Sequence, residues 1–215
     1  MKLIKIPFLL IWRLWFYILI TCTILLMSPF LLILTSKESY YSIFWKMIRG
    51  WAHVLVYGMG FRISKQIDQV LDRQKSYMFC PNHASLIDPF VLIVLSKNPI
   101  VFVGKKELTK IPIFGFFYKR TCIIVDRSDS KSRLAVFEEA RRRLCKGLDV
   151  CIFPEGLVPD DEGVILSEFK NGAFKLAIEH QIPIVPIIFY DCKKLFSYKC
   201  IFLGASVYSY CADYL

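Results

Sequence analysis

The hydrophobic and polar positions divide the chain into two regions with different patterns. Residues 14–34 contain no charged side chain, and as an α-helix they would extend about 31 Å, close to the thickness of the hydrocarbon core of a bilayer. Residues 40–57 interleave aromatic and aliphatic side chains with cations, which predicts an amphipathic helix lying at a membrane interface or packed on a domain core. We therefore expect residues 1–57 to form an N-terminal helical membrane anchor and residues 58–215 to form a globular domain.

The charges that flank the apolar segment do not choose its orientation. Cations lie on both sides of it: Lys2, Lys5 and Arg13 before, and Lys37, Lys46 and Arg49 after. A single pass and a hairpin or in-plane anchor with both ends cytoplasmic are both consistent with this distribution. Pro29 is a candidate break in the helix. A cleaved signal peptide fits less well, because the run is long and no small-x-small site follows it. The expected location is a membrane, at the cytoplasmic face of the inner or plasma membrane.

The second region alternates short β-rich runs with helical ones. Strands are expected at residues 61–67, 77–80, 99–103, 122–125, 150–153 and 184–189, and helices at residues 89–95, 130–146 and 171–180. Several of the strands are continuous apolar runs, which is typical of parallel sheets covered on both faces. The predicted fold class is therefore α/β, with a mostly parallel sheet covered by helices. In such sheets ligands bind at the carboxyl ends of the strands.

Composition and charge favour a lipid partner over a nucleic acid. The chain is 55% hydrophobic and has a formal net charge of +10. A cationic protein this apolar suits an anionic membrane surface. Nucleic acid is not an expected partner, since the aromatic residues concentrate in the N-terminal segment instead of along a basic stripe. The eight cysteines are scattered without a C-x-x-C pair, so we expect reduced thiols and no metal site.

Polar residues with catalytic potential follow the apolar run at residues 77–80. His83 lies at the expected carboxyl end of this strand, and Asp88 lies five residues later. A neutral histidine accepts a proton from a hydroxyl near pH 7, and a carboxylate within reach fixes its tautomer and stabilises the imidazolium. This spacing cannot pair the two side chains on a regular helix, so pairing requires a turn over residues 83–87. Taken alone, Asp88-Pro89 is explained as the start of a helix, with Asp88 as its cap and Pro89 at the first helical position, and this interpretation is compatible with the catalytic one.

Four sequence blocks in order resemble the glycerolipid acyltransferase family, which includes 1-acylglycerol-3-phosphate acyltransferases. The blocks are Asn82-His83-x4-Asp88; Gly104-Lys105-Lys106-Glu107-Leu108 with Ile111-Pro112-x-Phe114-Gly115 and Val125-Asp126-Arg127; Phe153-Pro154-Glu155-Gly156; and Ile184-Val185-Pro186-Ile187. The resemblance covers about residues 62–190. It implies that the globular region is an acyltransferase domain.

The resemblance also implies roles for the matching residues. His83 would be the general base that deprotonates the acceptor hydroxyl, and Asp88 would orient it. The hydroxyl oxygen would attack an acyl thioester directly, without an acyl-enzyme and without a cofactor, and acyl-CoA or acyl-carrier protein would be the co-substrate. The lysophospholipid acceptor would bind Arg127 and the turn formed by Glu155 and Gly156. Lys105 is a further candidate for binding phosphate or donor, and Pro186 would shape the donor side.

The sequence departs from the family pattern in two places. After Glu155-Gly156 the family usually has Thr-Arg, whereas this chain has Leu157-Val158. Family members also usually continue through further strand sequence where this chain reads Ile201 to Ser206, so we expect a shortened C-terminus. The leading prediction is acyl transfer to 1-acylglycerol-3-phosphate. The alternatives are transfer to another lysolipid, such as a lyso-aminolipid, and an inactive membrane-bound lipid-binding relative.

Overall fold

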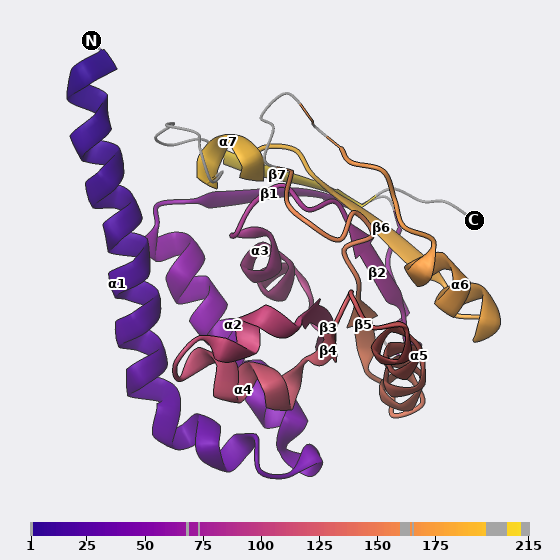
Figure 1. Cartoon of the computed structure of the whole chain (residues 1–215). Helices are drawn as coiled ribbons and strands as arrows, with labels where there is room; N and C mark the ends of the chain where they lie inside the picture. The colour runs from indigo at the N-terminus through magenta and orange to yellow at the C-terminus, as the bar shows by residue number, and fades with distance from the viewer. Residues whose placement is uncertain are drawn as a thin grey trace.

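The computed structural model describes residues 2–67, 69–72, 74–159, 164, 166–196 and 206–211. Its centre is a seven-stranded sheet with the order β1-β7-β6-β2-β5-β3-β4 (Figure 1). The strands are β1 (Arg62–Ile67), β2 (Met78–Pro81), β3 (Ile100–Lys105), β4 (Ile123–Val125), β5 (Asp149–Cys151), β6 (Ile184–Phe189) and β7 (Ser206–Cys211). All neighbouring strands run parallel except β6 and β7. The mostly parallel sheet expected from the sequence is therefore confirmed.

Helices cover both faces of this sheet. The helical elements are α1 (Lys2–Leu34), η1 (Glu38–Tyr40), α2 (Tyr41–Gly58), α3 (Asp88–Leu95), η2 (Lys106–Lys110), α4 (Phe114–Thr121), α5 (Ser130–Leu144), α6 (Gly172–Glu179) and α7 (Cys192–Phe196). Each of the three helices expected in the globular region is present as α3, α5 or α6.

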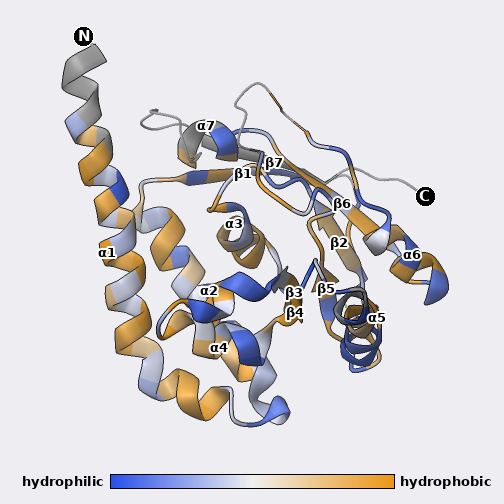
Figure 2. Ribbon diagram, viewed as in Figure 1, coloured by the Kyte–Doolittle hydropathy of each residue, from blue (hydrophilic) through white to orange (hydrophobic). Residues whose placement is uncertain are grey.

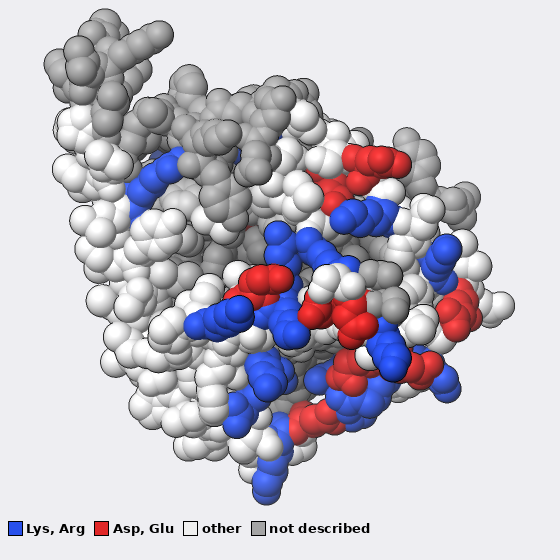
Figure 3. Space-filling view, viewed as in Figure 1, with Lys and Arg blue, Asp and Glu red and all other residues white. Residues whose placement is uncertain are grey.

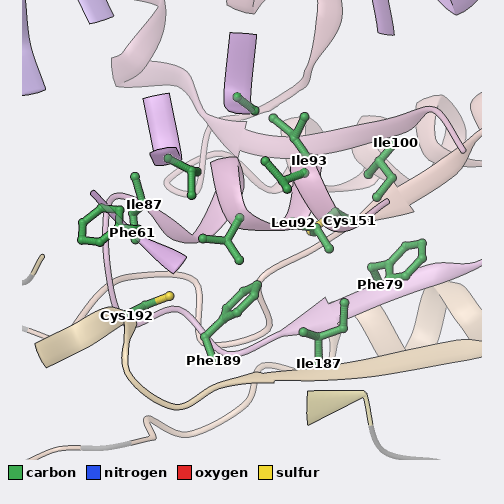
Figure 4. Packing of buried hydrophobic residues seen from close by; sticks show 14 of the residues in the cluster. Phe61, Phe79, Ile87, Leu92, Ile93, Ile100, Cys151, Ile187, Phe189 and Cys192 are labelled. Atoms are coloured by element: carbon green, nitrogen blue, oxygen red, sulfur yellow. The ribbon is translucent and has the colours of Figure 1, made fainter. Parts of the chain in front are cut away.

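Alternation along β2 shows how the two layers form. Phe79 joins a buried cluster with residues of α2 and α3, whereas its neighbours Met78 and Cys80 join a second cluster with residues of α5 and α6. Successive side chains of a strand point to opposite faces, so a continuous apolar run serves two cores. Figure 4 shows the first cluster, which includes Leu92 and Ile93 of α3 and the strand residues Phe79, Ile187 and Phe189.

The N-terminal apolar segment forms one continuous helix that packs along α2. Helix α1 passes through Pro7 and Pro29 without ending, so the candidate break at Pro29 is wrong. The Nε1 atoms of Trp12 and Trp15 donate to the carbonyls of Met59 and Gly58, at 3.3 and 2.9 Å. The amphipathic helix α2 in turn buries Trp45, Trp51 and Leu55. Its apolar face therefore packs on the domain core and does not lie exposed at a membrane interface.

The outer side of α1 remains apolar and exposed. Within it, Leu10–Leu34 is long and apolar enough to cross a membrane by length and composition. Leu26 is 77% exposed and Phe30 is 63% exposed, whereas Phe16 and Leu31 face the domain and are buried. Figure 2 shows this helix as mostly hydrophobic, and Figure 3 shows that its side of the molecule carries few charges, whereas lysine, arginine and acidic side chains gather on the opposite side.

Candidate functional site

The loop between β2 and α3 brings His83 and Asp88 into direct contact. The Oδ2 atom of Asp88 lies 3.0 Å from Nδ1 of His83, and it also accepts hydrogen bonds from the backbone N–H groups of Ala84 and Ser85, each at 2.7 Å. Residues 82–87 are not helical and curl around this one oxygen, which is the turn that the five-residue spacing requires. Asp88 is the first residue of α3, and Ile87 holds the cap position without a side-chain cap bond. The interpretation of Asp88 as the helix cap is therefore wrong.

The contact with Asp88 defines which nitrogen of the His83 imidazole is available for chemistry. An ionised carboxylate only accepts hydrogen bonds, so Nδ1 carries the proton and Nε2 is left as an acceptor. The His83 side chain is 20% exposed while Asp88 is fully buried. The imidazole also stacks on Phe153 with the ring centroids 4.1 Å apart. A ring held on one side by a carboxylate and on one face by an aromatic ring can present Nε2 to a hydroxyl in a fixed direction.

Asn82 fixes the start of this loop to the neighbouring strand. Its side-chain amide donates to the carbonyl of Phe189 at 3.2 Å, and its Oδ1 atom accepts from the N–H of Phe189 at 2.7 Å. Its backbone N–H also donates to the carbonyl of Ile187. Three hydrogen bonds to β6 make Asn82 a positioning residue for His83. This role is not visible in the sequence, because the side-chain partner of Asn82 lies 107 residues later in the chain.

Ser85 fixes the far end of the loop. Its hydroxyl donates to the carbonyl of Phe196 in α7 at 2.5 Å and accepts from the N–H of Ile87 at 3.2 Å. The ring of Phe196 lies against Phe16 of α1, with centroids 4.7 Å apart. The loop that carries His83 is therefore connected to the N-terminal helix through a single short helix.

Glu155 joins the third sequence block to the first. This buried carboxylate accepts from the backbone N–H of His83 through Oε1, at 2.6 Å, and from the N–H of Ser167 through Oε2, at 2.7 Å. Gly156 follows with a φ of +76°, a conformation that glycine adopts without steric cost. Both carboxylate oxygens of Glu155 therefore bind backbone groups, which makes it a support for the His83 loop; its expected contact with the acceptor remains a prediction.

Comparison with known proteins identifies the family. A sequence model described as Acyltransferase matches residues 62–190, which are more than half of the chain. The chain belongs to the acyltransferase family. The matched range contains all of the four sequence blocks, and it runs from β1 to the residue after β6.

Individual relatives agree with this assignment. The chain is 30% identical over 158 residues to human 1-acyl-sn-glycerol-3-phosphate acyltransferase beta, covering 69% of this chain and 56% of the relative. It is 31% identical over 119 residues to a probable 1-acyl-sn-glycerol-3-phosphate acyltransferase of Mycoplasma pneumoniae, covering 53% and 44%. It spans about half the length of the curated relatives it matches.

A solved structure supports the fold. The crystal structure of the 1-acyl-sn-glycerophosphate acyltransferase PlsC from Thermotoga maritima superposes with a TM-score of 0.77 and covers 99% of this chain and 87% of its own. At 19% identity this likeness shows the same architecture. The expectation of a shortened C-terminus involves residues 201–206, most of which lie outside the described residues, and it stays a prediction.

The second family block places Lys105 and Arg127 on the same edge of the sheet as His83. Lys105 ends β3 and Arg127 follows β4, and the order β2-β5-β3-β4 puts these strand ends side by side. At about 4.8 Å per strand, the ends of β2 and β4 lie roughly 14 Å apart. Partial burial lowers the pKa of the Arg127 guanidinium, and the nearby Glu107 and Tyr118 oppose that effect. Among the predicted site residues, Asp88 and Glu155 bond to the His83 loop directly, and the expected contact of Arg127 with the acceptor stays a prediction.

Gly104 and Gly115 of the second block lie so close to neighbouring groups that no β-carbon fits at either position. A β-carbon on Gly104 would lie 1.5 Å from the Tyr118 hydroxyl, and one on Gly115 would lie 2.2 Å from the backbone carbonyl oxygen of Thr109. The first approach packs α4 against the end of β3, and the second packs the start of α4 against η2. Pro186 of the fourth block lies in β6 opposite Cys80 of β2, in the middle of the sheet.

Cys80, three residues before His83, is packed inside the domain. Burial raises the pKa of its thiol to about 12, which favours a packed, protonated thiol over a thiolate nucleophile at neutral pH. In the described part of the chain, no group of three or more histidine, cysteine, aspartate or glutamate side chains is placed to hold a metal ion.

Proposed function

We propose that this chain transfers a fatty acyl group from acyl-CoA or acyl-carrier protein to the free hydroxyl of a lysophospholipid, with 1-acylglycerol-3-phosphate as the first candidate acceptor. The observation that carries the proposal is the 3.0 Å contact between Asp88 Oδ2 and His83 Nδ1. It leaves Nε2 of an accessible imidazole free at the carboxyl end of a central strand. The names of the relatives, which are 1-acyl-sn-glycerol-3-phosphate acyltransferases, support this choice of acceptor.

In the proposed mechanism, Nε2 of His83 takes the proton of the acceptor hydroxyl as its oxygen attacks the carbonyl carbon of the acyl thioester. The imidazolium that forms is stabilised by the Asp88 carboxylate. Collapse of the tetrahedral intermediate breaks the carbon–sulfur bond, and the proton on His83 passes to the departing thiolate. The products are the new ester and a free thiol, and no acyl-enzyme forms. A positioned base contributes about two to four powers of ten in rate, and the remainder comes from holding donor and acceptor together.

The packing of α1 supports an anchor that lies in the membrane plane. Its inner side is held to the domain from Trp12, which bonds to Met59, to Thr23, whose hydroxyl accepts from Trp51 Nε1 at 2.8 Å, and on to the buried Leu31. A single-pass orientation leading away from the domain would break these contacts. We therefore place the exposed side of α1 in the outer part of the cytoplasmic leaflet, where the net charge of +10 favours anionic lipid. Tags at residues 1 and 37 should then be reached by protease from the same side of sealed vesicles, whereas a single pass exposes only one.

An acceptor and donor panel tests the proposed reaction. Protein purified in detergent is supplied with labelled acyl-CoA or acyl-carrier protein and with lysophospholipids of different head groups, including a lyso-aminolipid and 1-acylglycerol-3-phosphate. Transfer to the phosphate-bearing acceptor supports the proposal. Transfer only to a lysolipid with another head group keeps the proposed reaction but makes that lysolipid the acceptor in place of 1-acylglycerol-3-phosphate. Folded protein that transfers to no acceptor from either donor would be a lipid-binding relative without this activity. Mass spectrometry of the protein after incubation with donor alone should show no added acyl group.

A further inference from the structure

The turn at Glu155 and Gly156 carries no positive charge of its own. Leu157 and Val158 follow it directly, and Leu157 is exposed. The Glu155 carboxylate is buried and both its oxygens are bound to backbone N–H groups. A phosphate-bearing acceptor at this turn would therefore need a cation from elsewhere in the chain.

Lys170 lies against this turn. Its Nζ atom is 3.2 Å, and its Cδ and Cε atoms 3.5 Å, from the position that a β-carbon on Gly156 would occupy. Its backbone N–H donates to the carbonyl of Pro154 at 2.9 Å. The lysine is thus held at both ends, by a backbone hydrogen bond to the third sequence block and by the packing of its stem over a glycine that leaves room for it.

The same contacts connect Lys170 to the His83 loop. Glu155 bonds to the N–H of His83 through one oxygen and to the N–H of Ser167 through the other. Residues 166–170 and the His83 loop are therefore fixed to one buried carboxylate, and the Lys170 ammonium lies beside the next residue, Gly156.

The Lys170 ammonium is available to bind an anion. Lys170 is exposed, and no carboxylate of the described residues forms an ion pair with its Nζ atom. Lys193, which approaches the same segment, donates instead to the carbonyl of Val164. An ammonium on a flexible stem binds phosphate as a point charge with three donors.

We propose that Lys170 binds the phosphate of the acyl acceptor at the Glu155–Gly156 turn and so selects acceptors with an anionic head group. This inference rests on the proposed acyl transfer, whose reacting hydroxyl would lie at His83 Nε2. Lys170 acts on binding and not on the proton transfer, so its loss should change the affinity for the acceptor and leave the base intact.

The first test compares Lys170→Gln and Lys170→Arg with wild type and with Lys175→Gln, a control at an exposed lysine of α6. Removing one charged hydrogen bond to phosphate should raise the KM for 1-acylglycerol-3-phosphate about 10- to 100-fold in Lys170→Gln, with little change in kcat or in the KM for the donor. Lys170→Arg keeps the charge and should recover most of the affinity. The KM for an uncharged 1-acylglycerol should be the same in all four proteins. An unchanged KM for the phosphate-bearing acceptor in Lys170→Gln, or an equal rise for the uncharged one, overturns the proposal.

A second test does not depend on turnover. An amine-reactive reagent modifies exposed lysines, and the modification of each is followed by mass spectrometry with and without glycerol 3-phosphate. Selective protection of Lys170 relative to Lys175 supports the phosphate site even if wild-type protein transfers no acyl group, in which case only the proposed function fails. Absence of protection at saturating glycerol 3-phosphate overturns the site.

Discussion

Replacing Asp88 should separate its contribution to folding from its contribution to catalysis. Its Oδ2 atom accepts three hydrogen bonds, from Nδ1 of His83 and from the backbone N–H groups of Ala84 and Ser85. Asp88→Ala removes the acceptor for all three. Asp88→Asn keeps a carbonyl oxygen that can occupy the same position but removes the negative charge.

The burial of the groups that bond to Asp88 determines how large the loss of stability should be. Ala84 and Ser85 are buried, so Asp88→Ala leaves two buried N–H groups without an acceptor, at about 1–3 kcal/mol each. We expect a loss of roughly 2–6 kcal/mol in the free energy of unfolding for Asp88→Ala and a clearly smaller loss for Asp88→Asn. Both variants lose the stabilisation of the His83 imidazolium, so both should lose about two to four powers of ten in kcat.

Two measurements on the same preparations test this reasoning. Thermal unfolding in detergent ranks stability, and the initial rate of acyl transfer at saturating substrates gives kcat. Asp72→Asn is the matched control, because Asp72 is exposed and its Oδ1 atom also accepts a backbone N–H, from Gln74 at 2.9 Å. If folded Asp88→Asn kept kcat within a few-fold of wild type, the carboxylate would not orient or stabilise the base, and the assignment of the pair would be refuted.

Two further predictions concern stability. Burial raises the pKa of Asp149 to about 6, while its carboxylate accepts the N–H of Tyr77 at 2.8 Å; protonation therefore favours the folded state, and stability from this group falls as pH rises through about 6. Asp149→Asn keeps an oxygen that can accept the N–H of Tyr77 and removes the buried charge. It should raise the free energy of unfolding at pH 8 by up to about 3 kcal/mol and have little effect near pH 4. A melting temperature below that of wild type at pH 8 would contradict this prediction. Gly115→Ala should lower both the melting temperature and the activity, because its β-carbon would lie 2.2 Å from the backbone oxygen of Thr109. Gly172→Ala is the control and should be neutral or stabilising, because a β-carbon there meets nothing within 4 Å. Equal melting curves for the two variants would count against the packing described for η2 and α4.

The strands that were predicted from the sequence are those with a recognisable local pattern of apolar residues. The strands β1 to β6 are short apolar or alternating runs bounded by polar residues, and each was expected within a few residues of its observed place. Strand β7 was not expected, because its pairing with β1 and β6 is long-range. Helix α4 was missed as well. It begins after Ile113, which has a φ of +63°, a conformation that a β-branched residue rarely adopts and that the sequence does not signal.

The contact between His83 and Asp88 was predictable, whereas the residues that hold their loop in place were not. The resemblance to the family selected His83 and Asp88, and the turn their spacing requires is present. The bonds that hold the turn come from Asn82, Ser85 and Glu155, and they join groups 72 to 111 residues apart in the chain. Such contacts follow from the order of strands in the sheet, which a single sequence does not contain. The same applies to Lys170, whose place over Gly156 depends on the path of the segment that follows β5.

The assignment of His83 as the base for acyl transfer is tested most directly by comparing His83→Ala with His180→Ala, a control histidine at the end of α6. Both proteins are purified in detergent and checked by thermal unfolding, and the rate of ester formation from labelled acyl donor and 1-acylglycerol-3-phosphate is measured. We predict that His83→Ala loses about two to four powers of ten in rate while His180→Ala retains the wild-type rate. Transfer by folded His83→Ala at the wild-type rate would contradict the assignment of His83 as the base.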